Sequence, residues 1–117
     1  MSKVKIIGYT RVANSAEAHT GMNSVEQQKK AIQQYVANTY PEYELDIWED
    51  VCSGTLSLSE RDNYKQIRPF LLSGNCDVLV TKNVARLSRS IGNCLDELAQ
   101  LRRAGVKVVF TDNNIAY

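Results

Sequence analysis

Short apolar runs alternate with longer segments of helical periodicity along this chain. Runs rich in β-branched and other apolar residues predict strands at residues 4–9, 43–48, 77–81 and 106–110. Apolar positions at helical spacing predict helices at residues 24–40, 61–73 and 90–104. This order predicts an α/β domain of three layers, in which helices cover both faces of a mostly parallel sheet of four to five strands.

The predicted helices have recognisable ends. The segment 24–27 (Ser-Val-Glu-Gln) is a capping box that opens the first helix, which should end before Pro41. Pro69 lies within the second helix and should shorten or kink it, and Gly74 should end it. Gly105 should end the third helix. The stretches 10–23, 50–60 and 82–89 are polar and are predicted to be loops.

Each predicted helix carries one apolar face. The residues expected on these faces are Val25, Ala31, Ile32, Tyr35 and Val36 in the first helix, Tyr64, Ile67 and Leu71 in the second, and Ile91, Leu95, Leu98 and Leu101 in the third. Helices of this kind bury their apolar face against the sheet.

Length and composition fit one soluble globular domain. The chain has 117 residues, of which 44% are hydrophobic, and a formal net charge of +1. So small a net charge argues against a protein held to DNA by bulk charge, but it leaves room for a local basic pocket. No run is long enough to span a membrane, and we expect a cytoplasmic protein.

The metal-binding residue types are sparse. Cys52, Cys76 and Cys94 are odd in number and widely spaced, so we expect reduced thiols, with no disulfide framework and no zinc site. His19 has no partner histidine and is given no metal role. We expect neither a metal nor another cofactor.

Charged residues gather where the predicted strands end, which is the usual place for a site in a parallel sheet. The residues at or beyond these ends are Tyr9, Thr10 and Arg11, Glu49 and Asp50, Lys82, Arg86 and Arg89, and Thr111 and Asp112. Guanidinium groups bind phosphate oxygens in a bidentate manner, so this edge is predicted to attract a phosphate or another anion.

Four segments, in order, carry a family resemblance. They are Gly8-Tyr9-Thr10-Arg11-Val12, Asn23-Ser24-Val25-Glu26-Gln27-Gln28, Glu49-Asp50-Val51-Cys52-Ser53-Gly54 followed by Arg61, and Lys82-Asn83-Val84-Ala85-Arg86-Leu87-Ser88-Arg89. Together they resemble the N-terminal catalytic domain of serine recombinases of the resolvase/invertase class. Each motif is weak alone, but the four at compatible spacings cover almost the whole chain.

Two positions depart from the family pattern. Ala13 stands where the family has its nucleophilic serine, and Ala85 stands where the family has an acidic residue. Asn14 replaces the usual Thr or Ser, and the following loop is about one residue longer than the resemblance suggests. Engineering of the two alanines and natural drift in a degenerate homologue both fit the sequence. Ser15 is two residues beyond the nucleophile position and is not expected to replace it.

The resemblance implies a reaction in which a serine hydroxyl attacks a DNA phosphate and forms a 5′-phosphoserine, without ATP or metal. It implies that arginines surround the phosphate and that an acidic residue orients one of them. On this sequence the arginines are Arg11, Arg61, Arg86 and Arg89, and the acidic residue is Asp50. Gln28 is either a hydrogen-bonding member of the site or a polar residue of the first helix. Lys82 is expected to face solvent rather than phosphate, and Tyr9 serves packing or catalysis.

The implied partner is DNA. Family members continue into a dimer-forming helix and a DNA-binding region, neither of which is present in residues 1–117, so we expect a homodimer or tetramer for the full-length protein. The fragment itself should be monomeric or weakly dimeric and should bind DNA weakly. Because Ala13 lacks a hydroxyl, we expect no cleavage. Whether the parent role is resolution, inversion, integration or transposition is left open.

Three other classes of protein are alternatives for this sequence. A recombinase-like module could bind DNA or a partner without catalysis, which would leave phosphate binding intact. A phosphoryl-receiver-like domain needs clustered acidic residues for magnesium, whereas arginines crowd the same edge here. Dinucleotide binding is disfavoured because Gly8 is not followed by a GxGxxG motif.

Overall fold

A computed structural model describes residues 3–12, 24–53, 55–88, 90–112 and 115–116. Its strands are β1 (Val4–Val12), β2 (Tyr43–Val51), β3 (Val78–Thr81), β4 (Lys107–Phe110) and β5 (Ile115–Ala116). Its helices are α1 (Val25–Thr39), α2 (Tyr64–Leu72), α3 (Val84–Leu87) and α4 (Ile91–Arg103), with a 3-10 turn η2 (Leu58–Glu60) before α2. No helix in this part of the chain is both long and apolar enough to cross a membrane.

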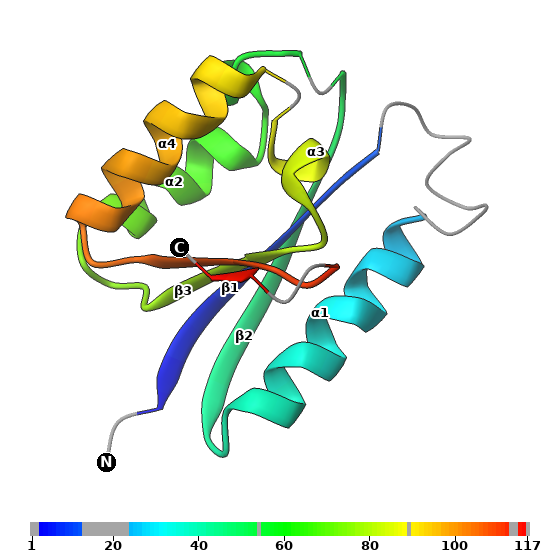
Figure 1. The fold of residues 1–117 in the computed structure, drawn as a ribbon, viewed down its shortest axis with the longest axis vertical. Coiled ribbons are helices and arrows are strands. Elements are labelled where there is room, and N and C mark those ends of the chain that lie inside the picture. The colour runs from blue at the N-terminus through cyan, green and yellow to red at the C-terminus, as the bar shows by residue number, and fades with distance from the viewer. Residues whose placement is uncertain (1–2, 13–23, 54, 89, 113–114, 117) are drawn as a thin grey trace.

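The strands form one sheet in the order β2-β1-β3-β4-β5, in which the first four are parallel and β5 is antiparallel. Helix α1 covers one face, whereas α2, α3 and α4 lie on the other (Figure 1). The connection from β1 to β2 runs toward one edge of the sheet, and the connection from β2 to β3 runs toward the other edge. Because both crossovers are expected to be right-handed, their helices lie on opposite faces of the sheet. The predicted three-layer α/β fold is confirmed.

Alternate residues of the strands build two separate cores. Ile6, Val78 and Val80 pack with Ile32 and Val36 of α1. Their neighbours in each strand point to the opposite face, where they pack against α2, α3 and α4. Strands covered on both faces have apolar residues in successive positions, which explains the unbroken apolar run of β3.

Gly8 lets α1 approach the sheet closely. A Cβ atom at this position would lie 3.0 Å from Ile32 Cγ2 and 3.1 Å from Ile47 Cγ1. Both distances are shorter than ordinary van der Waals contact, so a larger residue here would push α1 away from β1 and β2.

Two predicted strand ends were wrong. Strand β1 continues to Val12 and β2 to Val51, through residues predicted to be loop. The two strands pair in parallel to their last residues, with Arg11 opposite Asp50. These strand ends carry polar side chains, so a prediction based on apolar alternation did not include them. The result places Arg11 and Asp50 on adjacent strands of the sheet rather than on loops.

Two helical features also differ from the sequence prediction. Helix α2 begins at Tyr64, three residues after Arg61, and Pro69 lies inside it. The segment predicted to be a polar turn after β3 contains the one-turn helix α3. Asn83 caps α3, since its side chain accepts a hydrogen bond from the Arg86 N–H at 3.2 Å.

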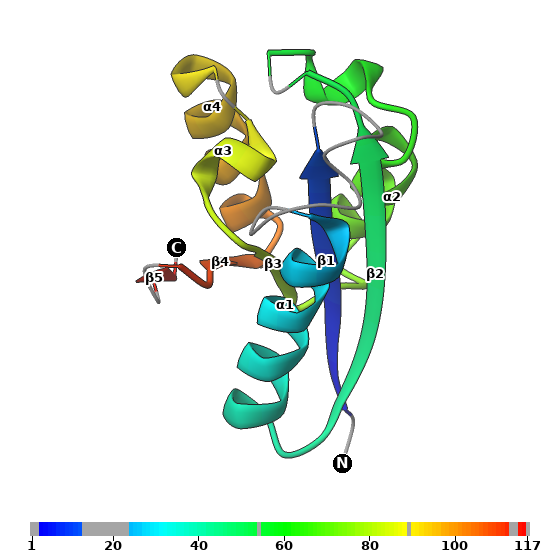
Figure 2. The same ribbon diagram turned by 90° about the vertical axis from the view of Figure 1, so that its right-hand side faces the viewer.

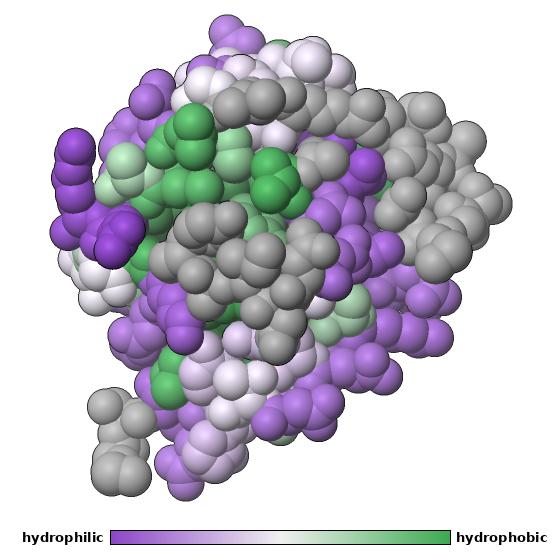
Figure 3. Space-filling model, in the orientation of Figure 1, coloured by the Kyte–Doolittle hydropathy of each residue, from purple (hydrophilic) through white to green (hydrophobic). Residues whose placement is uncertain are grey.

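The apolar face of α4 was assigned partly wrongly. Leu95 is 61% exposed, whereas Cys94, Glu97 and Leu101 are buried. Figure 3 shows hydrophobic surface over α4, where Leu95 and Leu98 line a hollow together with Ala99, Arg102 and Arg103. The buried face of α4 therefore contains a carboxylate that the sequence pattern gave no reason to expect. The three cysteines are free thiols, as predicted.

Candidate functional site

The carboxyl ends of β1 and β2 lie at the same end of the sheet, next to the first turn of α1 and close to α3 (Figure 2). Arg11, near the end of β1, is fully buried. Gln28 of α1 holds its backbone, with the Arg11 N–H donating to Gln28 Oε1 at 3.1 Å and Gln28 Nε2 donating to the Arg11 carbonyl at 3.0 Å. This two-way amide contact fixes the start of α1 against the end of β1.

Arg11 and Arg86 are bonded to each other's main chain. Arg11 Nε donates to the Arg86 carbonyl at 3.3 Å, and Arg86 Nη1 donates to the Arg11 carbonyl at 2.9 Å. Arg11 Nη1 also donates to the Cys52 carbonyl at 2.8 Å, just beyond β2. The end of β1, the end of β2 and α3 are thereby joined through one guanidinium group.

Arg61, which is also fully buried, reaches the same short helix from another direction. Its Nη1 donates to the Leu87 carbonyl, and its Nε donates to the Leu56 carbonyl at 3.3 Å. Arg11 and Arg61 thus bond the successive carbonyls of Arg86 and Leu87 at the C-terminal end of α3. Cations are favoured at that end of a helix, where carbonyl oxygens lack intrahelical partners.

Asp50 provides the buried negative charge of this site. Its Oδ2 accepts hydrogen bonds from the Tyr9 hydroxyl at 2.8 Å and from the Tyr64 N–H at 3.0 Å, and its Oδ1 accepts from the Asn63 N–H at 2.9 Å. Asp50 therefore binds the N–H groups at the start of α2, where a helix favours a carboxylate.

Tyr9 joins Asp50 to Arg61. Arg61 Nη1 donates to the Tyr9 hydroxyl at 3.3 Å, while that hydroxyl donates to Asp50. Burial raises the pKa of the Tyr9 phenol far above its usual value, so it stays protonated and can serve as this donor. The Tyr9 hydroxyl thus links the Asp50 carboxylate to the Arg61 guanidinium through two hydrogen bonds.

Six residues named from the sequence meet at this edge of the sheet. They are Tyr9, Arg11, Gln28, Asp50, Arg61 and Arg86. Among the described residues, three buried guanidinium groups lie there with one buried carboxylate. Guanidinium groups stay charged, so the excess of positive charge at this edge favours an anion with several oxygens, such as a phosphate. The described donors of these groups are bonded to main-chain carbonyls and to the Tyr9 hydroxyl.

Other named residues are not placed in the site. Ala13, Ser15, His19 and Arg89 lie outside the described residues. Ala85 belongs to α3, although its side chain is not among those described. Lys82 follows β3 and is half-buried.

Sequence reasoning missed a second buried polar contact. Arg68 belongs to none of the motifs noted in the sequence, but its Nε donates to both carboxylate oxygens of the buried Glu97 at 3.0 Å. The signal available was the helical spacing that puts Arg68 on the same side of α2 as Tyr64 and Leu71. No comparable pattern marks Glu97.

These features define an α/β domain with an arginine-lined site at the carboxyl edge of its parallel strands. The family model "Resolvase, N terminal domain" matches residues 6–117. The chain therefore belongs to the resolvase N-terminal domain family, the serine recombinase catalytic domains. None of the curated protein sequences matches it significantly.

Solved structures share the fold. The N-terminal catalytic domain of TP901-1 integrase aligns with a TM-score of 0.83 at 21% identity, over 96% of this chain and 81% of that one. The catalytic domain of ISC1926 TnpA, an IS607-like serine recombinase, gives 0.79 at 18% identity over 92% and 70%. A resolvase family site-specific recombinase from Streptococcus pneumoniae gives 0.76 at 20% identity over 97% and 76%.

Proposed function

We propose that residues 1–117 form the catalytic domain of a site-specific DNA recombinase, and that its buried arginines bind the DNA phosphate at which strands are exchanged. The observation that carries this proposal is the meeting of Arg11, Arg61 and Arg86 at the carboxyl edge of the sheet. Arg11 and Arg86 are bonded to each other's main chain, and Arg61, which lies just before α2, is bonded to the Leu87 carbonyl at the end of α3. Such an arrangement fixes positive charge at this edge, where it would stabilise the negative charge that develops on a phosphoryl group.

The reaction proposed for the intact family site is transesterification. A serine Oγ forms a bond to phosphorus, the bond from phosphorus to the 3′ oxygen breaks, and the 3′ oxygen leaves with a proton. The 3′-hydroxyl of the exchanged strand reverses the step. The arginines stabilise the charge that develops on the phosphoryl oxygens. Asp50 acts on Arg61 through Tyr9, so the carboxylate is kept off the phosphate it would repel.

We further propose that the chain as it stands binds DNA without cleaving it. Ala13 follows β1 in the sequence at the position of the family's nucleophile and has no hydroxyl with which to form a phosphoserine. Loss of a covalent nucleophile costs on the order of a millionfold in a serine hydrolase. Ala85 removes the acidic side chain that would give a proton to the leaving oxygen.

A DNA-binding titration tests the phosphate site. Fluorescence anisotropy with a short duplex at low salt should give weaker binding for Arg11→Gln, Arg61→Gln and Arg86→Gln, with the dependence of log affinity on log salt reduced by about one for each lost phosphate contact. Arg86→Lys should also weaken binding, because it keeps the charge but loses the fork.

The matched controls are Arg102→Gln and Arg103→Gln, which remove exposed arginines at the end of α4. Circular dichroism establishes that each variant is folded before its affinity is compared. Equal losses in control and site variants would mean that DNA is held by diffuse surface charge and would refute the proposed site.

A further inference from the structure

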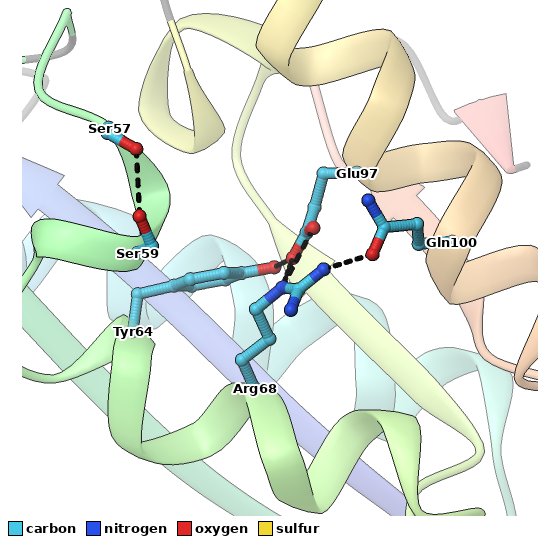
Figure 4. Close-up of polar contacts among 6 residues, drawn as sticks. All are labelled: Ser57, Ser59, Tyr64, Arg68, Glu97 and Gln100. Atoms are coloured by element: carbon cyan, nitrogen blue, oxygen red, sulfur yellow. Dashed lines mark hydrogen bonds and ion pairs between the residues drawn. The ribbon is translucent and has the colours of Figure 1, made fainter.

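A second polar cluster connects α2 to α4 on the face of the sheet away from α1. Figure 4 shows Tyr64 and Arg68 of α2 converging on Glu97 of α4. The Tyr64 hydroxyl donates to Glu97 Oε2, and Arg68 Nε donates to both carboxylate oxygens at 3.0 Å. Arg68 Nη2 also donates to Gln100 Oε1. Glu97 is only 4% exposed, so its charge is compensated by these donors rather than by water.

Tyr64 reaches from this cluster into the arginine site. It is the first residue of α2, and its N–H donates to Asp50 at 3.0 Å. Its ring meets the Tyr9 ring edge to face, with centroids 5.1 Å apart and planes at 73°. Tyr64 therefore contacts both Asp50 and Tyr9, whose hydroxyl accepts a hydrogen bond from Arg61. The Tyr64 hydroxyl, at the far end of the ring, is held by Glu97.

Packing of α2 against α4 does not by itself explain why this contact is polar. A buried ion pair costs desolvation, and well-packed apolar side chains would hold α2 to α4 at least as firmly. Hydrogen bonds add direction. A hydroxyl fixed to Glu97 at one end and an N–H fixed to Asp50 at the other leave the Tyr64 ring little freedom to move away from Tyr9. Burial also raises the pKa of the Tyr64 phenol well above its usual value, which keeps it a donor.

We propose that Glu97 and Arg68 are positioning residues for the arginine site. They hold Tyr64, Tyr64 holds Tyr9 and Asp50, and these two orient Arg61. The consequence for DNA binding rests on the proposed function, whereas the consequence for the geometry of Arg61 does not. The test therefore measures the two separately.

The geometry is measured by NMR. Tyr64→Phe removes only the hydroxyl tether, and Glu97→Ala removes its acceptor. Both should shift the Arg61 Nε–H signal and the Tyr9 ring signals, and Glu97→Gln, which keeps an oxygen acceptor, should shift them less. Tyr35→Phe, on α1 across the sheet, is the matched control and should leave them in place. Because Tyr64→Phe keeps the ring, it tests the tether even where Glu97→Ala unfolds.

The functional consequence is measured by the same anisotropy titration. Tyr64→Phe should weaken binding of the duplex on the order of tenfold. This magnitude is taken from metal sites, where loss of a residue that orients a ligand weakens binding by about tenfold or more. Its effect should not add to that of Arg61→Gln, since both act on one guanidinium.

The outcomes separate the two proposals. Unmoved Arg61 and Tyr9 signals in Tyr64→Phe, or equal shifts in Tyr35→Phe, would overturn the positioning role. The positioning role would also be overturned if Tyr64→Phe kept its full DNA affinity while Arg61→Gln lost affinity. Shifted signals in a protein whose DNA binding ignores Arg61→Gln would support the positioning role and refute the proposed phosphate site.

Discussion

Replacing Asp50 by asparagine should destabilise the domain strongly, although the two side chains have the same shape. Asp50 is 4% exposed and accepts three hydrogen bonds, two at Oδ2 and one at Oδ1. The amide of asparagine keeps one acceptor oxygen, which can serve Tyr9 and Tyr64. Its NH₂ group would then face the Asn63 N–H, so two donors would meet.

The magnitude follows from these contacts. A buried N–H left without an acceptor costs about 1–3 kcal/mol. Loss of the buried carboxylate near the site arginines adds to this cost, by less than the about 3–5 kcal/mol that breaking a direct buried charge pair costs. We expect Asp50→Asn to lower the free energy of unfolding by about 3 kcal/mol, a large share of the about 5–15 kcal/mol of a typical domain.

Urea unfolding measures this loss through the single tryptophan, Trp48, which lies on β2 and packs against the core. With a slope of about 1.5 kcal/mol per molar urea, the midpoint should fall by about 2 M. Asp46→Asn, an exposed site on the same strand, should change the free energy of unfolding by less than about 0.5 kcal/mol. Equal midpoints for the two variants would refute the assignment of Asp50 as a buried acceptor.

Three further predictions use the same unfolding assay or simple chemistry. Gly8→Ala should lower the free energy of unfolding by about 1–3 kcal/mol, because its Cβ would meet isoleucines of α1 and β2. Gly92→Ala, whose Cβ would have nothing within 4 Å, should raise it by up to about 1 kcal/mol. The reverse order would contradict the packing described. The free energy of unfolding should fall as pH rises above about 10, because burial raises the pKa of Tyr9 and Tyr64 above the ordinary 10.0. Above that pH the two phenols lose their protons in the unfolded chain but not in the folded one. A free energy of unfolding that stays constant from pH 9 to 11 would count against this. A thiol reagent at pH 8 should label the half-buried Cys52 before the buried Cys76 and Cys94. All three should react slowly, because burial raises the pKa of each thiol. Simultaneous labelling of the three would disagree with their burial.

The sequence predicted the layers of this fold because its apolar periodicities are strong. The fully buried strand β3 and the capped helix α1 leave little ambiguity, and the Ser24 side chain accepts the hydrogen bond from the Gln27 N–H that the capping box implies. Gly105, which follows the C-cap residue Ala104 of α4, has a positive φ of 86°, as a helix-ending glycine should.

The site was harder to predict because tertiary contacts decide it. Arg11 and Asp50 lie on strands, yet arginine and aspartate are poor indicators of strand. Their hydrogen-bond partners come from other elements: α1 and α3 for Arg11, and β1 and the start of α2 for Asp50. Helix α3 is a single turn, too short for any periodicity, and hydrogen bonds from distant arginines hold its end. Glu97 was missed because burial of a carboxylate depends on partners from another helix.

The most direct test of the proposed function is a search for a covalent protein–DNA intermediate. The double variant Ala13→Ser, Ala85→Asp is incubated, without added metal, with supercoiled DNA that carries the sequences flanking its gene. It is then run on a denaturing gel beside the unchanged protein. A covalent band in the variant alone is the expected result, because the arginine site would then have its nucleophile and proton donor. Absence of that band, in a variant whose arginine-dependent DNA binding is intact, would contradict the assignment of this edge as a recombinase active site.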